Sequence, residues 1–126
     1  MTNIHFHLKS QLRLMHGDDI ALGPGKADLL AAILETGSIS SAGRALGLSY
    51  RRAWLMADMM NRCFRQPLIE TSHGGARGGG ARLTPFGRDI LARYRAAQTA
   101  MAELAARHFS DLDSILAPDD GGPADI

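Results

Sequence analysis

Four consecutive residues, Ser49 to Arg52, combine a helix cap with two adjacent cations. The hydroxyl of Ser49 can cap a helix that begins at Tyr50, so that Arg51 and Arg52 lie in its first turn. Positive charge at that end opposes the helix dipole and costs a few tenths of a kcal/mol. Because a sequence selected only for folding would place Asp or Glu there, the arginine pair indicates function, and its chemistry is contact with phosphates or base edges.

The charges of the whole chain are segregated around these residues. The 126 residues include 14 Lys and Arg and 13 Asp and Glu, for a net charge of +1. Residues 1–39 carry a net −1, residues 40–110 carry 11 arginines and a net +7, and residues 111–126 carry a net −5. Arginine suits forked contacts to phosphate and guanine. A GC-rich genome would also enrich arginine, so the positions of these residues have to distinguish the two explanations.

Three helices are predicted to position the arginine pair. Residues 26–36 form an amphipathic helix that stops at Gly37. Ser40 can cap a short second helix, a left-handed Gly47 ends it, and a third helix runs from residue 50 to about residue 64. Small residues let the second and third helices approach closely, which is typical of a helix-turn-helix. A generic helical corner is the alternative interpretation.

A glycine-rich segment after the third helix predicts a wing. Short strands are expected at 68–71 and 81–83, with glycines filling the loop between them. A strand follows these glycines, which excludes a nucleotide-binding phosphate loop. A merely mobile loop is the alternative to a wing that contacts the DNA backbone or minor groove. The residues expected to contact DNA are Ser40, Ser49, Tyr50, Arg51, Arg52, Leu55, Arg62, His73, Arg77 and Arg82.

A long helix is predicted from Pro85 to about Phe109, capped by Thr84. About 25 residues at about 1.5 Å each give a rod of about 38 Å. A chain of this size cannot bury the whole rod, so we expect it to pair with a second copy about a twofold axis. The expected dimerisation residues follow the 4-3-4-3-4 spacing of a coiled-coil seam. They are Ile90, Tyr94, Ala97, Met101, Leu104 and His108.

The N-terminal segment has a different pattern. From Ile4 to Met15 apolar and polar residues nearly alternate, which predicts a half-buried strand or two short strands in a hairpin. His5 and His7 would share one face of that strand and could bind a metal if Cys63 or His16 lay nearby. Solvated histidines are the alternative, and no metal or other cofactor is expected.

The remaining features limit the class of protein. A lone cysteine excludes a disulfide framework, no apolar run approaches about 20 residues, and the chain does not open on a secretory signal. No Ser/His/Asp arrangement or plausible carboxylate pair is present, so an enzyme is not expected. We expect a cytoplasmic protein without a membrane partner, in which residues 1–110 form a DNA-binding domain and residues 111–126 form an acidic, flexible tail.

Several stretches resemble the N-terminal DNA-binding domain of the molybdate-responsive ModE regulators. They are Thr36–Ser40, Ala45–Trp54, Met60–Asn61, Gly74–Ala81 and Leu83–Gly87, within roughly residues 25–105. The last of these is shared more loosely with LysR-type regulators. The resemblance implies a winged helix-turn-helix, mainly α with a small β component, that acts as a homodimer in sequence-specific control of transcription. It also implies that residues 49–52 start the recognition helix and residues 74–82 form the wing.

Full-length members of the ModE family add a C-terminal module that binds molybdate. This chain ends where that module would begin and resembles the short, stand-alone members, so we carry over no oxyanion binding and assign no particular effector. The expected function is therefore a homodimeric regulator that binds double-stranded DNA at a roughly palindromic operator. The alternative is a winged-helix module for protein–protein contact, in which the arginines would meet an acidic partner.

Overall fold

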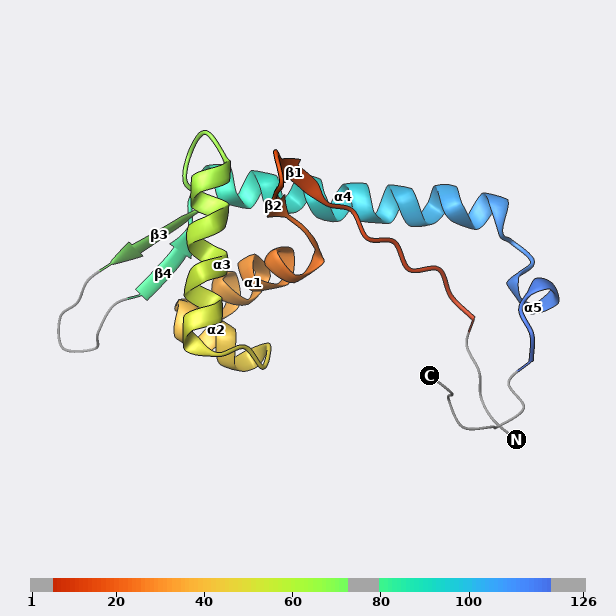
Figure 1. The fold of residues 1–126 in the computed structure, drawn as a ribbon, viewed down its shortest axis with the longest axis horizontal. Helices are drawn as coiled ribbons and strands as arrows, with labels where there is room; N and C mark the ends of the chain where they lie inside the picture. Colours follow the sequence, from red (N-terminus) through yellow and green to blue (C-terminus); the bar gives the residue numbers. More distant parts are fainter. Residues whose placement is uncertain (1–5, 73–79, 119–126) are drawn as a thin grey trace.

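The computed structural model describes residues 6–72 and 80–118, and this part of the chain is mainly helical. The elements in chain order are β1 (Leu14–His16), β2 (Asp19–Leu22), α1 (Pro24–Thr36), α2 (Ile39–Ala45), α3 (Tyr50–Cys63), β3 (Ile69–Ser72), β4 (Gly80–Leu83), α4 (Pro85–His108) and α5 (Leu112–Ile115). Figure 1 shows α1, α2 and α3 gathered near the start of α4, with the hairpin of β3 and β4 projecting away from them. The second half of α4 extends away from this group in the opposite direction.

The predicted helix-turn-helix is formed by α2 and α3. The backbone of Gly47 has a φ of 72°, the left-handed conformation predicted for the turn. The N–H of Leu48 donates to the carbonyl of Gly43 at 2.8 Å. A Cβ on Gly43 would lie 2.9 Å from the Cβ of Ala53, closer than side chains tolerate. The two helices therefore cross at a point where only glycine fits.

Of the three N-caps that the sequence predicted, Ser49 and Thr84 are confirmed and the cap of α2 is not. The prediction that Ser40 caps α2 is wrong, because the N-cap is Ser38, whose Oγ accepts from the N–H of Ser41 at 2.9 Å. Ile39 is buried with 3% exposure, so the helix begins there and Ser40 lies inside the first turn. Ser49 caps α3 as predicted and accepts a backbone N–H at 3.0 Å.

One apolar core joins the helices to both hairpins. Its fully buried side chains are Leu22, Leu29, Leu30, Ile33, Met60 and Leu68. These come from β2, α1, α3 and the segment just before β3, so the core holds all four together. Only one side of α3 contributes, through Ala53, Ala57 and Met60. The core therefore determines which side of α3 faces solvent.

The hairpin of β3 and β4 is the predicted wing. The strands pair antiparallel, with Ile69 opposite Leu83, and both side chains are buried at its base with 3% exposure. The N–H of Ala81 donates to the carbonyl of Gly37 at 2.8 Å. Gly37 has a φ of 78° and ends α1, as predicted. One strand of the wing is thus hydrogen-bonded to the turn that leads into the helix-turn-helix.

The predicted strand between Ile4 and Met15 is wrong over residues 6–13. The strand begins at Leu14 and pairs with β2 across Gly17, which has a φ of 61°. Within the described residues, positions 6–13 have no partner strand. They lie in extended backbone beside α4 (Figure 1), and the carbonyl of Leu12 accepts a hydrogen bond from the hydroxyl of Tyr94 at 2.6 Å. The alternation of this segment comes from packing on a helix.

The prediction of a long helix after the wing is confirmed by α4. The Oγ1 of Thr84 accepts from the N–H of Gly87 at 2.8 Å, and Pro85 occupies the first helical turn. The first part of α4 packs on the core through Ile90 and Tyr94, whereas no residue of the helix after Tyr94 is buried. The first part of α4 therefore packs against the winged part of the molecule, and the second part extends away from it.

Candidate nucleic-acid interface

The outward side of α3 is formed by residues that the core leaves exposed. At about 3.6 residues per turn, Arg51, Leu55 and Arg62 lie opposite the buried Ala53 and Ala57. Arg52 follows Arg51 in the first turn of α3. The side chains of Arg52 and of the three residues opposite the core are all exposed. The start of α3 thus presents two neighbouring guanidinium groups to solvent.

The structure shows no partner for these two guanidinium groups among the residues that it describes. Neither Arg51 nor Arg52 makes a side-chain hydrogen bond or ion pair with any residue that the structure describes. Arg62, on the same side of the helix, lies 3.0 Å from a carboxylate oxygen of Asp58. Exposed pairs of this kind contribute about 0–1 kcal/mol. The arginine pair can therefore bind an anion without breaking a contact, and Arg62 can do so at small cost.

Lys26 lies near the start of α3, and a backbone contact holds its ammonium group. The ammonium group of Lys26 donates to the carbonyl of Ile20. Burial is the largest cause that lowers the pKa of Lys26, and the positive charge of Arg52 lowers it further. The ammonium group of Lys26 is therefore held by a backbone carbonyl, whereas the guanidinium groups of Arg51 and Arg52 make no such contact with the described residues.

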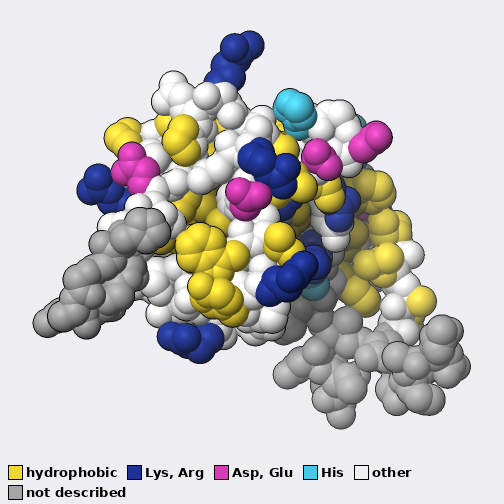
Figure 2. Space-filling model, turned by 60° about the vertical axis from the view of Figure 1, so that its left-hand side comes forward, with side chains coloured by type: hydrophobic (Ala, Val, Ile, Leu, Met, Phe, Trp, Pro, Cys, Tyr) yellow, Lys and Arg dark blue, Asp and Glu magenta, His cyan; other side chains and the backbone are white. Residues whose placement is uncertain are grey.

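An exposed aromatic pair lies on the side of α3 that faces the wing. The rings of Tyr50 and Trp54 are 6.1 Å apart, and the two residues are 65% and 39% exposed. Together with Ser40 they line a groove between the helix-turn-helix and the wing strands. In Figure 2 apolar side chains gather on the face that is turned forward, and both Lys or Arg and Asp or Glu side chains lie around them. The surface therefore combines apolar contact area with charged side chains.

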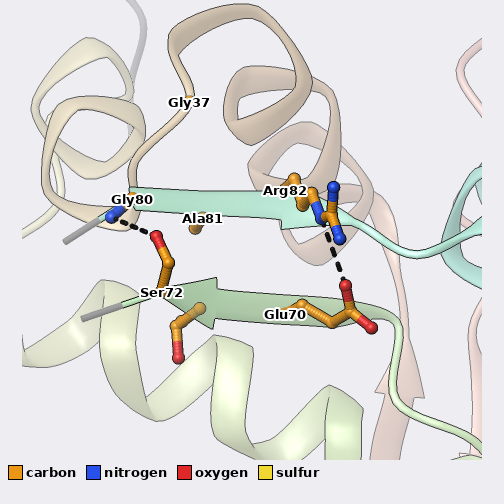
Figure 3. Close-up of a pocket in the computed structure, with 7 residues that line it drawn as sticks. Gly37, Glu70, Ser72, Gly80, Ala81 and Arg82 are labelled. Atoms are coloured by element: carbon orange, nitrogen blue, oxygen red, sulfur yellow. Dashed lines mark hydrogen bonds and ion pairs between the residues drawn. The ribbon is translucent and has the colours of Figure 1, made fainter. Parts of the chain in front are cut away.

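One of the wing residues predicted to contact DNA, Arg82, lies within the described part of the chain. The Nε of Arg82 lies 3.2 Å from a carboxylate oxygen of Glu70 on the facing strand, and both side chains are exposed (Figure 3). Farther out, the N–H of Gly80 donates to the Oγ of Ser72 at 3.2 Å. The other predicted wing residues, His73 and Arg77, lie outside the described residues.

Among the described residues, the pocket in Figure 3 is lined by one carboxylate and one guanidinium group. Its volume is about 440 Å³. Its lining consists of Gly37, Glu70, Thr71, Ser72, Gly80, Ala81 and Arg82. Of these described residues, Glu70 supplies the carboxylate, and it is paired with the guanidinium group of Arg82. Across residues 6–72 and 80–118, no three His, Cys, Asp or Glu side chains cluster as metal ligands would. His5, named in the possible His-x-His site, is not among those residues.

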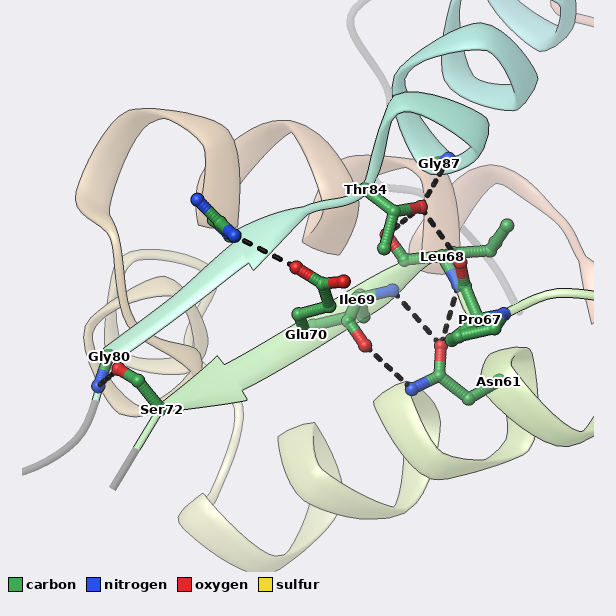
Figure 4. A network of polar contacts seen from close by, with 10 residues as sticks. Asn61, Pro67, Leu68, Ile69, Glu70, Ser72, Gly80, Thr84 and Gly87 are labelled. Carbon is green, nitrogen blue, oxygen red and sulfur yellow. Dashed lines mark hydrogen bonds and ion pairs between the residues drawn. The ribbon is translucent and has the colours of Figure 1, made fainter. Parts of the chain in front are cut away.

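A polar junction that the sequence analysis missed sets the position of the wing relative to α3. The Nδ2 of Asn61 donates to the carbonyl of Ile69 at 3.0 Å, and its Oδ1 accepts from the N–H groups of Leu68 at 2.9 Å and Ile69 at 3.1 Å (Figure 4). The Oγ1 of Thr84 donates to the carbonyl of Pro67 at 2.8 Å. We call Asn61, Pro67, Leu68, Ile69 and Thr84 the Leu68 junction. It joins α3, β3 and α4, and an isolated asparagine on a helix gave no indication of it.

The predicted seam of α4 divides into two parts. Ile90 and Tyr94 are buried within this chain, with 9% and 3% exposure. Burial also raises the pKa of Tyr94. These two side chains already belong to the core of one chain, which corrects the expectation that the whole seam is left for a second copy. The later seam positions are half-buried or exposed: Ala97, Met101, Leu104 and His108.

Solved structures define the class of protein. The MarR family transcription regulator SP03579 aligns with a TM-score of 0.55 and 26% identity, over 71% of this chain and 60% of that chain. The full-length LTTR LysG from Corynebacterium glutamicum, with bound effector Arg, aligns with a TM-score of 0.54 and 22% identity, over 75% of this chain and 30% of that chain. The fold is a winged helix, mainly α with a small β component, as the sequence predicted.

Sequence similarity to curated proteins narrows the class of winged-helix protein further. The chain is 45% identical over 83 residues to the molybdenum-pterin-binding protein MopB of Rhodobacter capsulatus, covering 66% of this chain and 31% of MopB. It is 42% identical over 91 residues to the molybdenum transport protein ModE of Azotobacter vinelandii, covering 69% and 34%. It is 33% identical over 100 residues to the DNA-binding transcriptional dual regulator ModE of Escherichia coli K12, covering 79% and 35%.

These matches support a ModE-like family for the chain. The chain spans about a third of the length of these curated relatives. No protein-family model matches it. Within the described ranges, no helix is both long enough and apolar enough to span a bilayer.

Proposed function

We propose that the chain is a sequence-specific DNA-binding regulator of transcription. The observation that carries this proposal is the pair of guanidinium groups of Arg51 and Arg52, which have no partner in the described part of the chain and lie at the exposed start of α3 in a winged helix. A recognition helix presents its N-terminal residues to base edges in the major groove, and arginine forks match the acceptors of guanine. The name of the Escherichia coli relative, a DNA-binding regulator, points the same way.

In this arrangement the remaining contact residues have graded roles. Tyr50 and Leu55 extend the base-facing surface, while Ser40 and Ser49 lie where hydroxyls can donate to phosphate oxygens. Arg62 and Arg82 exchange exposed carboxylate partners for phosphates. Two further contact residues, His73 and Arg77, remain predictions for the tip of the wing.

We also propose that the regulator acts as a homodimer through the second half of α4. Leu104 is 51% exposed and Phe109 just beyond the helix is 48% exposed, which is unfavourable for a lone chain in water. A dimer that binds a palindromic site is expected to present its two copies of α3 about 34 Å apart, one turn of DNA, or a multiple of that distance. We assign residues 1–110 to the DNA-binding and dimerisation unit and residues 111–126 to an acidic extension.

Selection of duplexes from a random-sequence library tests both parts of the proposal. We expect the wild-type protein to enrich a roughly palindromic site, and sedimentation of the complex to show two chains per duplex. Failure to enrich any sequence contradicts DNA recognition, and enrichment of a single half-site by one chain contradicts the dimer. Binding to an acidic protein with no affinity for duplexes would instead favour a protein-interaction module.

A further inference from the structure

The outward side of α3 contains an apolar strip that folding does not explain. Leu55 is 54% exposed and lies between Arg51 and Arg62 on the side opposite the core. Trp54 and Tyr50 continue the apolar surface toward the wing. The solvent side of a surface helix normally carries polar residues, and an exposed leucine that adjoins an exposed aromatic pair extends an apolar patch of the kind that marks a binding site.

We infer that Leu55, with Trp54 beside it, recognises thymine through the 5-methyl group of the base. This inference rests on the proposed function, since it requires α3 to enter the major groove. The methyl group of thymine is the apolar group that base edges present in that groove. The charges of Arg51 and Arg52 bring a polyanion to this side of the helix, and they suit guanine or phosphate rather than a methyl group.

The arrangement on α3 predicts a composite readout. Arg51 lies one turn before Leu55 on the same side of the helix, so the two side chains meet neighbouring base pairs. A half-site is then expected to contain a guanine near a thymine. Asp58 follows Leu55 by three residues and holds Arg62 at 3.0 Å, which leaves the leucine as the uncharged centre of the strip.

Replacement of thymine by deoxyuridine tests the inference, because the two bases differ only in the methyl group. The duplex enriched by the wild-type protein is resynthesised with each thymine replaced in turn, and binding is followed by fluorescence anisotropy. We expect one or two replacements in each half-site to weaken wild-type binding by about fourfold each, the value of one buried methyl group. L55A is expected to bind the thymine and deoxyuridine duplexes equally.

L34A is the matched control, since Leu34 is an exposed leucine on α1 with 46% exposure. It is expected to retain the wild-type preference for thymine. The inference is overturned if wild-type protein binds every deoxyuridine duplex as tightly as the parent, if L55A keeps the full preference, or if the enriched site lacks thymine. Those results leave the proposed function intact, whereas loss of duplex binding by the wild-type protein overturns both.

Discussion

Two helices of this chain leave a surface uncovered, and the two surfaces differ in chemistry. On α3 the exposed side carries Arg51, Arg52 and a narrow apolar strip, whereas the second half of α4 carries Met101 and Leu104. The same core buries the other side of α3 and the first part of α4. The fold of a single chain therefore does not explain either exposed surface. The surface on α3 suits a polyanion, and we propose that the surface on α4 suits a second copy of the chain.

The Leu68 junction keeps these two surfaces in a fixed relation. Asn61 belongs to α3, and Thr84 caps α4, and both bind the backbone around Leu68. A change at this junction is expected to disturb both surfaces together. A change on either helix farther away is expected to disturb only one.

The largest effect is expected from G87A. A Cβ on Gly87 would lie 2.1 Å from the carbonyl oxygen of Leu68, so the backbone of the junction has to move. We expect a loss of about 3 kcal/mol in the free energy of unfolding, measured by urea denaturation. G25A is the control, because its Cβ would meet only the Cε of Met56 at 3.9 Å. An equal loss in both variants would contradict this account of the junction.

R51A tests the cationic surface of α3 independently of the dimerisation surface proposed on α4. We expect a loss of about 1–3 kcal/mol in binding to the selected duplex, measured by anisotropy, with no change in dimerisation. R93A is the matched control, because Arg93 lies on α4, 3.6 Å from a carboxylate oxygen of Asp89. If R93A weakens binding as much as R51A does, general charge rather than the start of α3 accounts for the affinity.

L104E tests the apolar surface of α4 independently of the cationic surface of α3. A carboxylate buried between two copies is costly, so we expect dimerisation to weaken by at least about tenfold, measured by analytical ultracentrifugation. L34E makes the same change at an exposed leucine on α1 and is expected to leave dimerisation unchanged. A dimer of wild-type strength in L104E would remove the second half of α4 from the interface.

The smallest effect is expected from Y94F. The hydroxyl of Tyr94 donates to the carbonyl of Leu12 at 2.6 Å, and its removal leaves that carbonyl without this donor. We expect a loss of about 1 kcal/mol in the free energy of unfolding. Y50F removes a hydroxyl from a residue that is 65% exposed, and it is expected to have no measurable effect. Equal stability of Y94F and wild type would mean that residues 6–13 are held on α4 by other contacts.

Local patterns in the sequence predicted most of the fold. Gly37 and Gly47 were identified as left-handed stops, and Ser49 and Thr84 as caps, because each of these roles depends on neighbouring residues alone. The predictions failed where distant segments decide the outcome. The N-terminal segment alternates like a strand but packs along α4, and its hydrogen bond to Tyr94 joins residues 82 positions apart.

In the candidate site, too, local features could be predicted from the sequence and contacts between distant segments could not. The positions of Arg51 and Arg52 at the start of a capped helix could be predicted from spacing. The pairing of Arg82 with Glu70 and the contacts of Asn61 could not, because they depend on the register of the wing and on backbone atoms far away in sequence. Burial of Ile90 and Tyr94 within one chain was missed because a seam pattern does not specify which partner covers it.

The salt dependence of duplex binding tests the central claim most directly. Wild-type protein, the R51A/R52A double variant and R93A would be titrated into a random-sequence duplex over a range of NaCl concentrations, with log Kd plotted against log salt. We predict that wild type and R93A share one steep line, and that the double variant binds more weakly with a slope reduced by about 0.9 for each phosphate that it no longer neutralises. Superimposable lines for wild type and the double variant would contradict the assignment of α3 as the DNA-binding helix.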